Sequence, residues 1–169
     1  MQIAAARLQE QLAKGLRSIY ALHGDEPLLQ QEAADLIRQT ARDQGYTERH
    51  VFTVAGAHFD WESVQAAAGA MSLFSDKLLM DVRIPSGKPG KEGSVALQQL
   101  AQQAEGNEGV LTLVLLPRLD RMSTQGAWFS ALETSGVTIK VDPIERAQLP
   151  AWIAARLARH GQRVLAGEA

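Results

Sequence analysis

The stretch GVLTLVLLP, residues 109–117, is the most apolar run in the chain and contains no charged residue. Its apolar side chains are nearly continuous instead of alternating with polar ones. A strand with one face in water would alternate, so this run predicts a strand of a parallel sheet that is covered on both faces. Because parallel strands need crossover connections, the run also predicts helices before and after it.

The rest of the chain repeats this alternation of strand and helix. Short apolar or β-branched runs predict strands at 19–23, 50–54, 78–83, 110–116 and 137–141. Apolar residues spaced three and four apart predict helices over about 3–16, from Pro27 to a left-handed stop at Gly45, and over 60–71, 94–104, 124–136 and 149–160. Asp60 fits the capping position of one of these helices, and Pro27 fits a first helical position. The pattern is typical of an α/β fold with an open, doubly wound, five-stranded parallel sheet.

Composition narrows the class of protein. The chain has 169 residues, of which 46% are hydrophobic, enough for one globular domain. Its net charge of −2 and its pI near 6.1 give no general attraction to nucleic acid. There is no cysteine, which excludes disulfides and thiolate metal sites and fits a cytoplasmic location. No segment approaches the roughly 18 apolar residues of a membrane span, so we expect no membrane contact.

The residues of the turn after the first predicted strand indicate whether this domain has a nucleotide site. A phosphate-binding loop has the pattern G-x-x-x-x-G-K-[ST], whose lysine neutralises phosphate and whose hydroxyl holds Mg²⁺. The chain instead has HGDEPLLQQEA (23–33), with one glycine, no lysine, and the acids Asp25 and Glu26 where phosphate would lie. P-loop ATPases also need an acid where the apolar strand ends, but LTLVLLPRLD (111–120) delays its first acid to Asp120. We therefore predict no nucleotide site and no cofactor.

The sequence shows no pattern typical of catalysis or metal binding. The histidines are scattered, without metal-ligand spacing or a paired acid nearby: His23, His50, His58 and His160. The G-x-S-x-G motif of a serine nucleophile is absent. Lys88 and Lys91 lie in a Pro/Gly-rich loop, where solvated lysines are the simpler interpretation. We expect no catalytic site and no metal site in this chain.

The stretch GAMSLFSDK (69–77) lies where the pattern of the 60–71 helix ends. One helical stripe faces the sheet and consists of Trp61, Val64, Ala68 and Met71. At about 100° per residue, Phe74 falls at the edge of that stripe and Leu73 points away from it. If the helix ends near Ala70, both side chains can instead fold into the core. The polar neighbours Ser72, Ser75 and Asp76 favour an exposed turn, and the pattern alone leaves the two interpretations open.

Several colinear stretches resemble one known family. They are LRSIYALHGDEPLLQQEAADLIRQTARDQGY, AMSLFSDKLLMDVR, LPRLDRMSTQGAWFSALE and IERAQLPAWIAARLARHG. Together they resemble the N-terminal region of the delta subunit of the bacterial DNA polymerase III clamp loader, and AMSLFSDK is the most specific part. The resemblance implies an AAA+/P-loop-like domain without a functional nucleotide site. It also implies binding to the sliding clamp (beta subunit) and help in opening that ring, with Leu73, Phe74 and Met71 inserted into a hydrophobic cleft of the clamp.

The resemblance further implies a domain organisation. Residues 1–160 correspond to the AAA+-like clamp-binding domain, and 161–169 to the start of a truncated lid domain or tail. In that family a later C-terminal region joins the other clamp-loader subunits, and the subunit contacts DNA only within the complete loader. The family belongs to DNA polymerase III, a DNA-directed DNA polymerase, although we expect no catalytic site in this chain. The alternatives are an AAA+-type ATPase or nucleotide-sensing domain, and a scaffolding domain that uses the same apolar patch on another partner.

Overall fold

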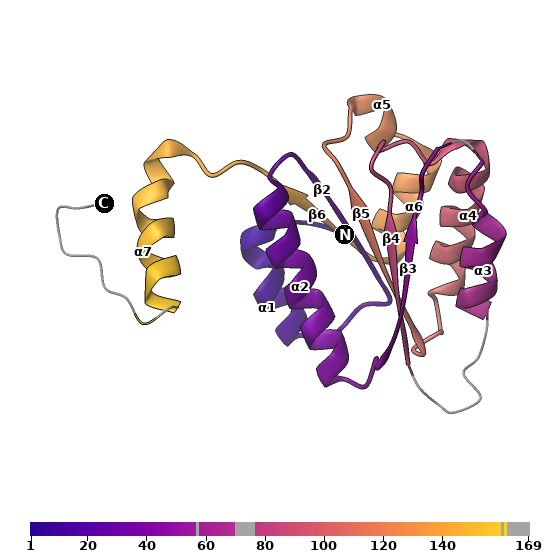
Figure 1. Cartoon of the computed structure of the whole chain (residues 1–169), viewed down its shortest axis with the longest axis horizontal. Coiled ribbons are helices and arrows are strands. Elements are labelled where there is room, and N and C mark those ends of the chain that lie inside the picture. The colour runs from indigo at the N-terminus through magenta and orange to yellow at the C-terminus, as the bar shows by residue number, and fades with distance from the viewer. Residues whose placement is uncertain (57, 70–76, 160, 162–169) are drawn as a thin grey trace.

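The computed structural model describes residues 1–56, 58–69, 77–159 and 161. Strands and helices alternate along the chain around a single central sheet, with helices on both of its faces (Figure 1). The predicted α/β class, with an open, doubly wound parallel sheet, is therefore confirmed.

The sheet has six strands in the order β1-β6-β2-β5-β4-β3, and every neighbouring pair is parallel. The strands are β1 (Gln2–Ala4), β2 (Ile19–Gly24), β3 (Glu48–Thr53), β4 (Leu78–Arg83), β5 (Val110–Leu116) and β6 (Val137–Val141). The prediction of five strands was wrong, because β1 lies in the stretch predicted as helix. With three residues β1 is too short to show a period of two, and its pairing with β6, Ile3 opposite Ile139, overrides the helical pattern of the sequence.

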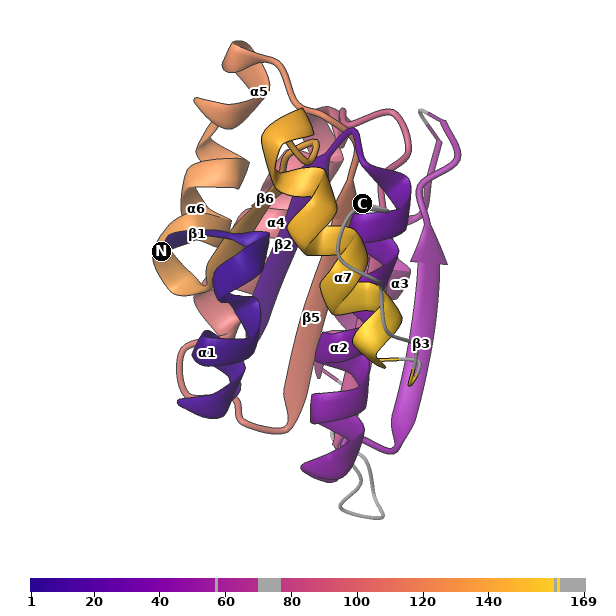
Figure 2. The ribbon, with the colours of Figure 1, turned by 90° about the vertical axis from the view of Figure 1, so that its left-hand side faces the viewer.

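The helices divide between the two faces of the sheet (Figures 1 and 2). One face carries α1 (Leu8–Ala13) and α2 (Pro27–Asp43); the other carries α3 (Trp61–Gly69), α4 (Gly90–Gln103) and α6 (Ala127–Ser135). Short α5 (Arg121–Thr124) precedes α6, α7 (Leu149–Arg159) ends the described fold, and the 3₁₀ turns Ala5–Arg7 and Arg146–Gln148 precede α1 and α7. The helix predicted over 124–136 begins only at Ala127, as α6, because Gly126 has an extended backbone.

Local sequence signals position several helix ends as predicted. Asp60 caps α3, because its Oδ1 accepts hydrogen bonds from the backbone N–H of Glu62 at 3.0 Å and of Ser63 at 3.2 Å. Pro27 is the first residue of α2. Gly45 follows that helix with a φ of +93°, a left-handed conformation that favours glycine.

Two apolar clusters hold the layers together, one on each face of the sheet. Under α3, α4 and α6, the predicted stripe of Trp61, Val64 and Ala68 is buried against the sheet. Under α1 and α2, Ile37 packs with Tyr20 and Leu113 of the central strands. Burial of β2, β4 and β5 on both faces explains their nearly continuous apolar sequences.

Candidate functional site

The carboxyl ends of β2 and β5 form the topological switch point of the sheet. After β2 the chain crosses toward β3 at one edge, and after β5 it crosses to β6 on the opposite side of β2. In open α/β sheets, ligands bind in the crevice outside the strand ends at this point. A nucleotide-binding relative would place its phosphates here, so the groups that fill the position are informative.

Side chains of this chain already engage the switch point. Gln30 Nε2 donates hydrogen bonds to the carbonyl oxygens of Leu22, at 3.3 Å, and Leu116, at 2.6 Å, tying the ends of β2 and β5 together. Next to it, Arg118 Nη1 donates to Asp25 Oδ2 at 3.2 Å. The first turn of α2 therefore presents a neutral amide bound to backbone, and the loop before it presents an acid paired with arginine.

Gly24 serves strand packing at this edge. It lies opposite Val141 of β6, and a Cβ at position 24 would meet the Val141 carbonyl oxygen at 2.0 Å. Glycine is needed here because the backbones of β2 and β6 approach closely. This requirement accounts for the residue without any role in binding phosphate.

The segment that contains the predicted clamp-binding residues joins α3 to β4. Met71, Leu73 and Phe74 lie within 70–76, outside the described residues. Because α3 runs antiparallel to the strands, its end at Gly69 and the start of β4 at Leu78 both lie at the amino edge of the sheet. The segment is therefore attached at the edge opposite the α2 turn.

Contacts at the amino edge hold Lys77 and Leu78, the two residues that follow this segment. The backbone N–H of Glu48 donates to the Lys77 carbonyl at 3.3 Å, and that of Leu78 donates to the Gly109 carbonyl at 2.9 Å. The Lys77 ammonium lies 5.1 Å from the ring centre of Tyr46, a cation–π distance. The start of β3 and the residue before β5 thus fix the position from which the chain enters β4.

An ionic cluster that the sequence analysis did not identify lies between α2 and the strands β3 and β4, at one side of the sheet. Asp81 on β4 is fully buried and accepts hydrogen bonds from Arg38 of α2 at 2.8 and 3.1 Å, from Arg49 of β3, and from Arg83 at 3.4 Å. Burial by itself would raise the pKa of Asp81, but the hydrogen bond from Arg49 and the charge of Arg38 outweigh it, and the pKa is lowered. An acid inside the apolar run LLMDVR was the available signal.

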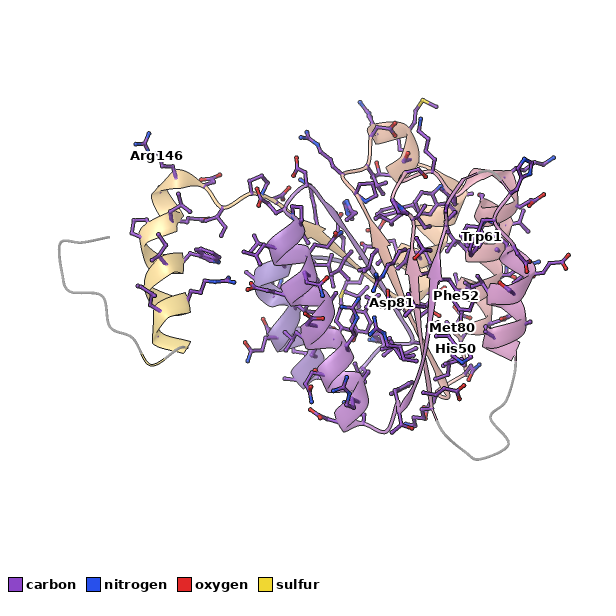
Figure 3. All side chains as sticks on the ribbon, in the orientation of Figure 1. His50, Phe52, Trp61, Met80, Asp81 and Arg146 are labelled. Carbon is purple, nitrogen blue, oxygen red and sulfur yellow. The ribbon has the colours of Figure 1, made fainter. Side chains whose placement is uncertain are left out.

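This cluster is suited to structure and not to catalysis. Both Asp81 oxygens already face guanidinium donors, and Arg38 also binds Asp35 at 2.7 Å. The carboxylate, labelled in Figure 3, therefore joins α2 and the edge strand β3 to β4. Within the described part of the chain, no group of three or more His, Cys, Asp or Glu side chains could hold a metal ion.

The three histidines that the structure describes are not brought together, and His160 lies outside the described residues. His50 and His58 are exposed, whereas His23 on β2 is buried, with its ring edge-on to Phe129 at 5.3 Å between centres. Its Nε2 has no hydrogen-bond partner among the described residues. Burial, and then the charge of Lys140, lowers the pKa of His23, so the neutral ring is favoured.

Comparison with known proteins identifies the family. Residues 20–142 match the family model described as DNA polymerase III, delta subunit. The chain belongs to this family. It is 35% identical over 150 residues to DNA polymerase III subunit delta of Escherichia coli K12, covering 89% of this chain and 43% of that protein. It is 26% identical over 157 residues to the Haemophilus influenzae subunit, covering 90% of this chain and 44% of that one. The chain therefore spans less than half the length of these delta subunits.

Solved structures agree on the fold of this delta-family chain. The clamp loader delta protein of Bacillus subtilis superposes with a TM-score of 0.66 at 20% identity, over 94% of this chain and 48% of that protein. The ORC2 protein of Aeropyrum pernix, solved as ADPNP–ADP complexes, gives 0.50 at 14% identity, over 90% and 49%. At these identities the likeness shows the fold alone, which is AAA+-like. No helix within the described ranges is long and apolar enough to cross a membrane.

Proposed function

We propose that this chain is the clamp-binding part of a clamp-loader delta subunit. It binds the sliding clamp (beta subunit) through Leu73 and Phe74, together with Met71, and favours the open ring that is loaded onto DNA during replication. The observation that carries the proposal is the family match over residues 20–142, which includes both flanks of GAMSLFSDK. The alternatives, a nucleotide-sensing ATPase domain and a scaffold for another partner, have no comparable support.

The buried stripe of α3 supports an outward position for the apolar pair. That stripe includes Ala68, one residue before the described end of the helix. Five residues later, at about 100° per residue, Leu73 has the phase of the solvent side, whereas Met71 has a phase near the stripe. We therefore assign the main contact to Leu73 and Phe74 and a secondary one to Met71.

The proposal includes the domain organisation. Residues 1–160 form the AAA+-like clamp-binding domain, and 161–169 begin a lid domain or tail. A later region of the full-length subunit contacts the other loader subunits. The subunit contacts DNA only within the complete loader. This chain itself has no catalytic role, and its place of action is the cytoplasm, where replication occurs.

The test is the double substitution Leu73→Ser/Phe74→Ser. Burying each side chain is worth about 1.5–3 kcal/mol, so its loss should abolish clamp binding measured without nucleotide. Thermal stability should change little, because the proposal keeps both side chains out of the core. If they were core residues, the same change would cost several kcal/mol of folding stability.

A matched control is available on α2. Leu28 and Leu36 are exposed leucines on the opposite face of the sheet. The variant Leu28→Ser/Leu36→Ser removes similar apolar surface and should bind the clamp like the wild type. Retained clamp binding by Leu73→Ser/Phe74→Ser, or a large loss of its stability, would contradict the proposal.

A further inference from the structure

The outer edge of β3 has no neighbouring strand in the described part of the chain. β3 is the last strand in the sheet order and pairs with β4 alone (Figure 2). The backbone N–H of Glu48 donates to the Lys77 carbonyl at 3.3 Å, and that of Val54 donates to the Arg83 carbonyl at 2.8 Å. In a parallel ladder every second residue bonds to the same neighbour, so the even-numbered residues of β3 face β4. The outward N–H and C=O groups are therefore those of Arg49, Val51 and Thr53.

The side chains of the same three residues are exposed on the α2 side of the sheet. Arg49 lies opposite Leu79, which belongs to the apolar cluster under α1 and α2. Side chains alternate along a strand, so Val51 and Thr53 share this side with Arg49, and all three are exposed. On the other side, Phe52 packs against the cluster under α3 and α4. One side of β3 thus fixes the strand, and the other is open.

Two arginines on the open side are held in place. The side chains of Arg49 and Arg83 are 39% and 43% exposed, and both donate to the buried carboxylate of Asp81. A guanidinium group has five N–H donors, and each of the two uses one on Asp81. The acid of the strand itself, Glu48, points to the other side, where it contacts His50 at 2.8 Å. Both arginines therefore have donors left for a second carboxylate, and their anchoring lowers the cost of ordering them.

The arginines outnumber the acids that pair with them. Asp81 accepts hydrogen bonds from Arg38, Arg49 and Arg83. The other acid in this group is Asp35, which accepts from Arg38. Three positive charges thus face two negative ones, in a chain whose net charge is −2. Because Arg38 is buried, the excess positive charge is presented by the two exposed arginines. We name this open side the arginine edge, and it consists of Arg49, Val51, Thr53 and Arg83.

We propose that the arginine edge binds an extended acidic peptide segment of a partner protein, which joins the sheet as a further strand. The backbone of the peptide pairs with the three outward residues of β3, the mode known as β-strand addition. The pattern acidic–x–apolar–x–acidic places its two carboxylates beside Arg49 and Arg83 and its apolar side chain beside Val51, which is 48% exposed. This inference goes beyond the proposed clamp binding and does not depend on it.

Charge and backbone geometry together select this occupant. The phosphates of a nucleic acid offer only hydrogen-bond acceptors, so they match the arginines but not the outward carbonyl oxygens of β3. A second copy of the same edge would bring its own arginines against these, and like charges on adjacent strands are destabilising. An extended acidic peptide provides backbone donors and acceptors and also negative charge.

The experiment titrates a capped synthetic peptide, Ser-Glu-Thr-Val-Thr-Glu-Ser, into the ¹⁵N-labelled chain at low salt. The backbone amide signals of Arg49, Val51 and Thr53 should shift and saturate, because these N–H groups gain acceptors. The matched peptide with lysine in place of both glutamates should bind at least about tenfold more weakly, since its charges oppose the arginines. A short DNA duplex and inorganic phosphate are titrated in parallel.

Two substitutions test the two kinds of contact. Arg49→Gln removes one carboxylate-binding group and should weaken binding of the acidic peptide by about tenfold. Val51→Pro removes an outward N–H, and an edge strand accepts proline where its N–H faces solvent; binding should again fall by about tenfold. Arg121→Gln on exposed α5 removes the same charge outside the arginine edge and should bind within about twofold of the wild type. Circular dichroism checks the fold of each variant.

The remaining outcomes would overturn the inference. They are wild-type binding by both Arg49→Gln and Val51→Pro, and equal binding of the glutamate and lysine peptides. Absence of saturable shifts up to about 5 mM peptide would mean that the arginines only protect the edge from pairing. Shifts of the same amides with DNA or phosphate but not with the peptide would assign the arginines to phosphate. If Arg49→Gln unfolds, Val51→Pro decides. The clamp is absent from every titration, so failure here leaves the proposed function untouched.

Discussion

Asp81 shows at the scale of one residue how a charge can hold layers of secondary structure together. Arg38 beside it is also buried, so each group compensates a charge that would otherwise be very unfavourable away from water. The pairing of Arg38 with Asp81 connects α2 to β4, on the face of the sheet that α2 covers. The contribution of Asp81 to the fold should therefore greatly exceed that of an acid on the surface.

Asp81→Asn should lower the free energy of unfolding by about 3 kcal/mol, because it leaves the buried guanidinium of Arg38 without its main counter-charge. Urea unfolding at neutral pH measures the change. Asp35→Asn is the control: Asp35 binds the same arginine, but its side chain is 60% exposed, so the loss should stay below about 1 kcal/mol. Equal losses in the two variants would show that burial does not decide the contribution.

His23 should make the stability of the domain fall in mild acid. Its pKa is lowered in the folded state, so the unfolded chain binds more protons, and unfolding is favoured as the pH falls below about 6.5. At pH 8 the contribution is fully present. Urea unfolding at pH 8, 7, 6 and 5 should show a smaller loss for His23→Leu than for the wild type, and parallel profiles would disprove the role of this residue.

At the scale of the element, the sequence predicted those parts of the fold that local pattern encodes. Strands β4, β5 and β6 have the predicted bounds, and Asp60 caps α3, because apolar runs and capping residues act locally. β1 was missed because it depends on pairing with β6, more than 130 residues away in the register Gln2 to Thr138. The late start of α6 was missed too: Gly126 before it is extended, and a Cβ there would lie 3.0 Å from the Trp128 ring nitrogen.

The candidate site also has a part that could be predicted from the sequence and a part that could not. The family resemblance identified Leu73 and Phe74 where helical phase left both interpretations open, and their placement stays a prediction. The ionic cluster around Asp81 could not be derived, because Arg38, Arg49 and Asp81 come from three elements whose contact is tertiary.

The turn between β2 and α2 predicts the response to nucleotide. Gln30 binds the strand carbonyls, and Asp25 and Glu26 add negative charge where phosphate would lie. Isothermal titration with Mg-ATP should therefore give no binding heat up to about millimolar concentration, because like charges repel in the turn. The clamp titration of the same sample serves as the positive control. Saturable binding in the micromolar range would support the nucleotide-sensing alternative.

At the scale of the whole molecule, the two faces of the sheet differ in the character of their outer surfaces. The α2 side carries paired charges, and the α3–α4 side carries amides and small apolar residues. The segment proposed to bind the clamp is attached at the amino edge of the sheet, whereas α7 lies on the side of α2 (Figure 1). Because α7 lies apart from that edge, its contribution to the stability of the domain can be measured separately.

Removal of residues 143–169 should leave the domain folded and able to bind the clamp. Every described side chain of α7 is exposed or half-buried, and the ion pair of Arg156 with Glu32 is partly exposed and therefore weak. The melting temperature should fall by less than about 3 °C. Removal of residues 1–4 is the control: it deletes β1 and the bond from the Met1 ammonium to the Gly136 carbonyl at 2.9 Å, and it should lower the melting temperature more. A greater loss from the C-terminal truncation would mean that α7 belongs to the core of the domain instead of lying against it.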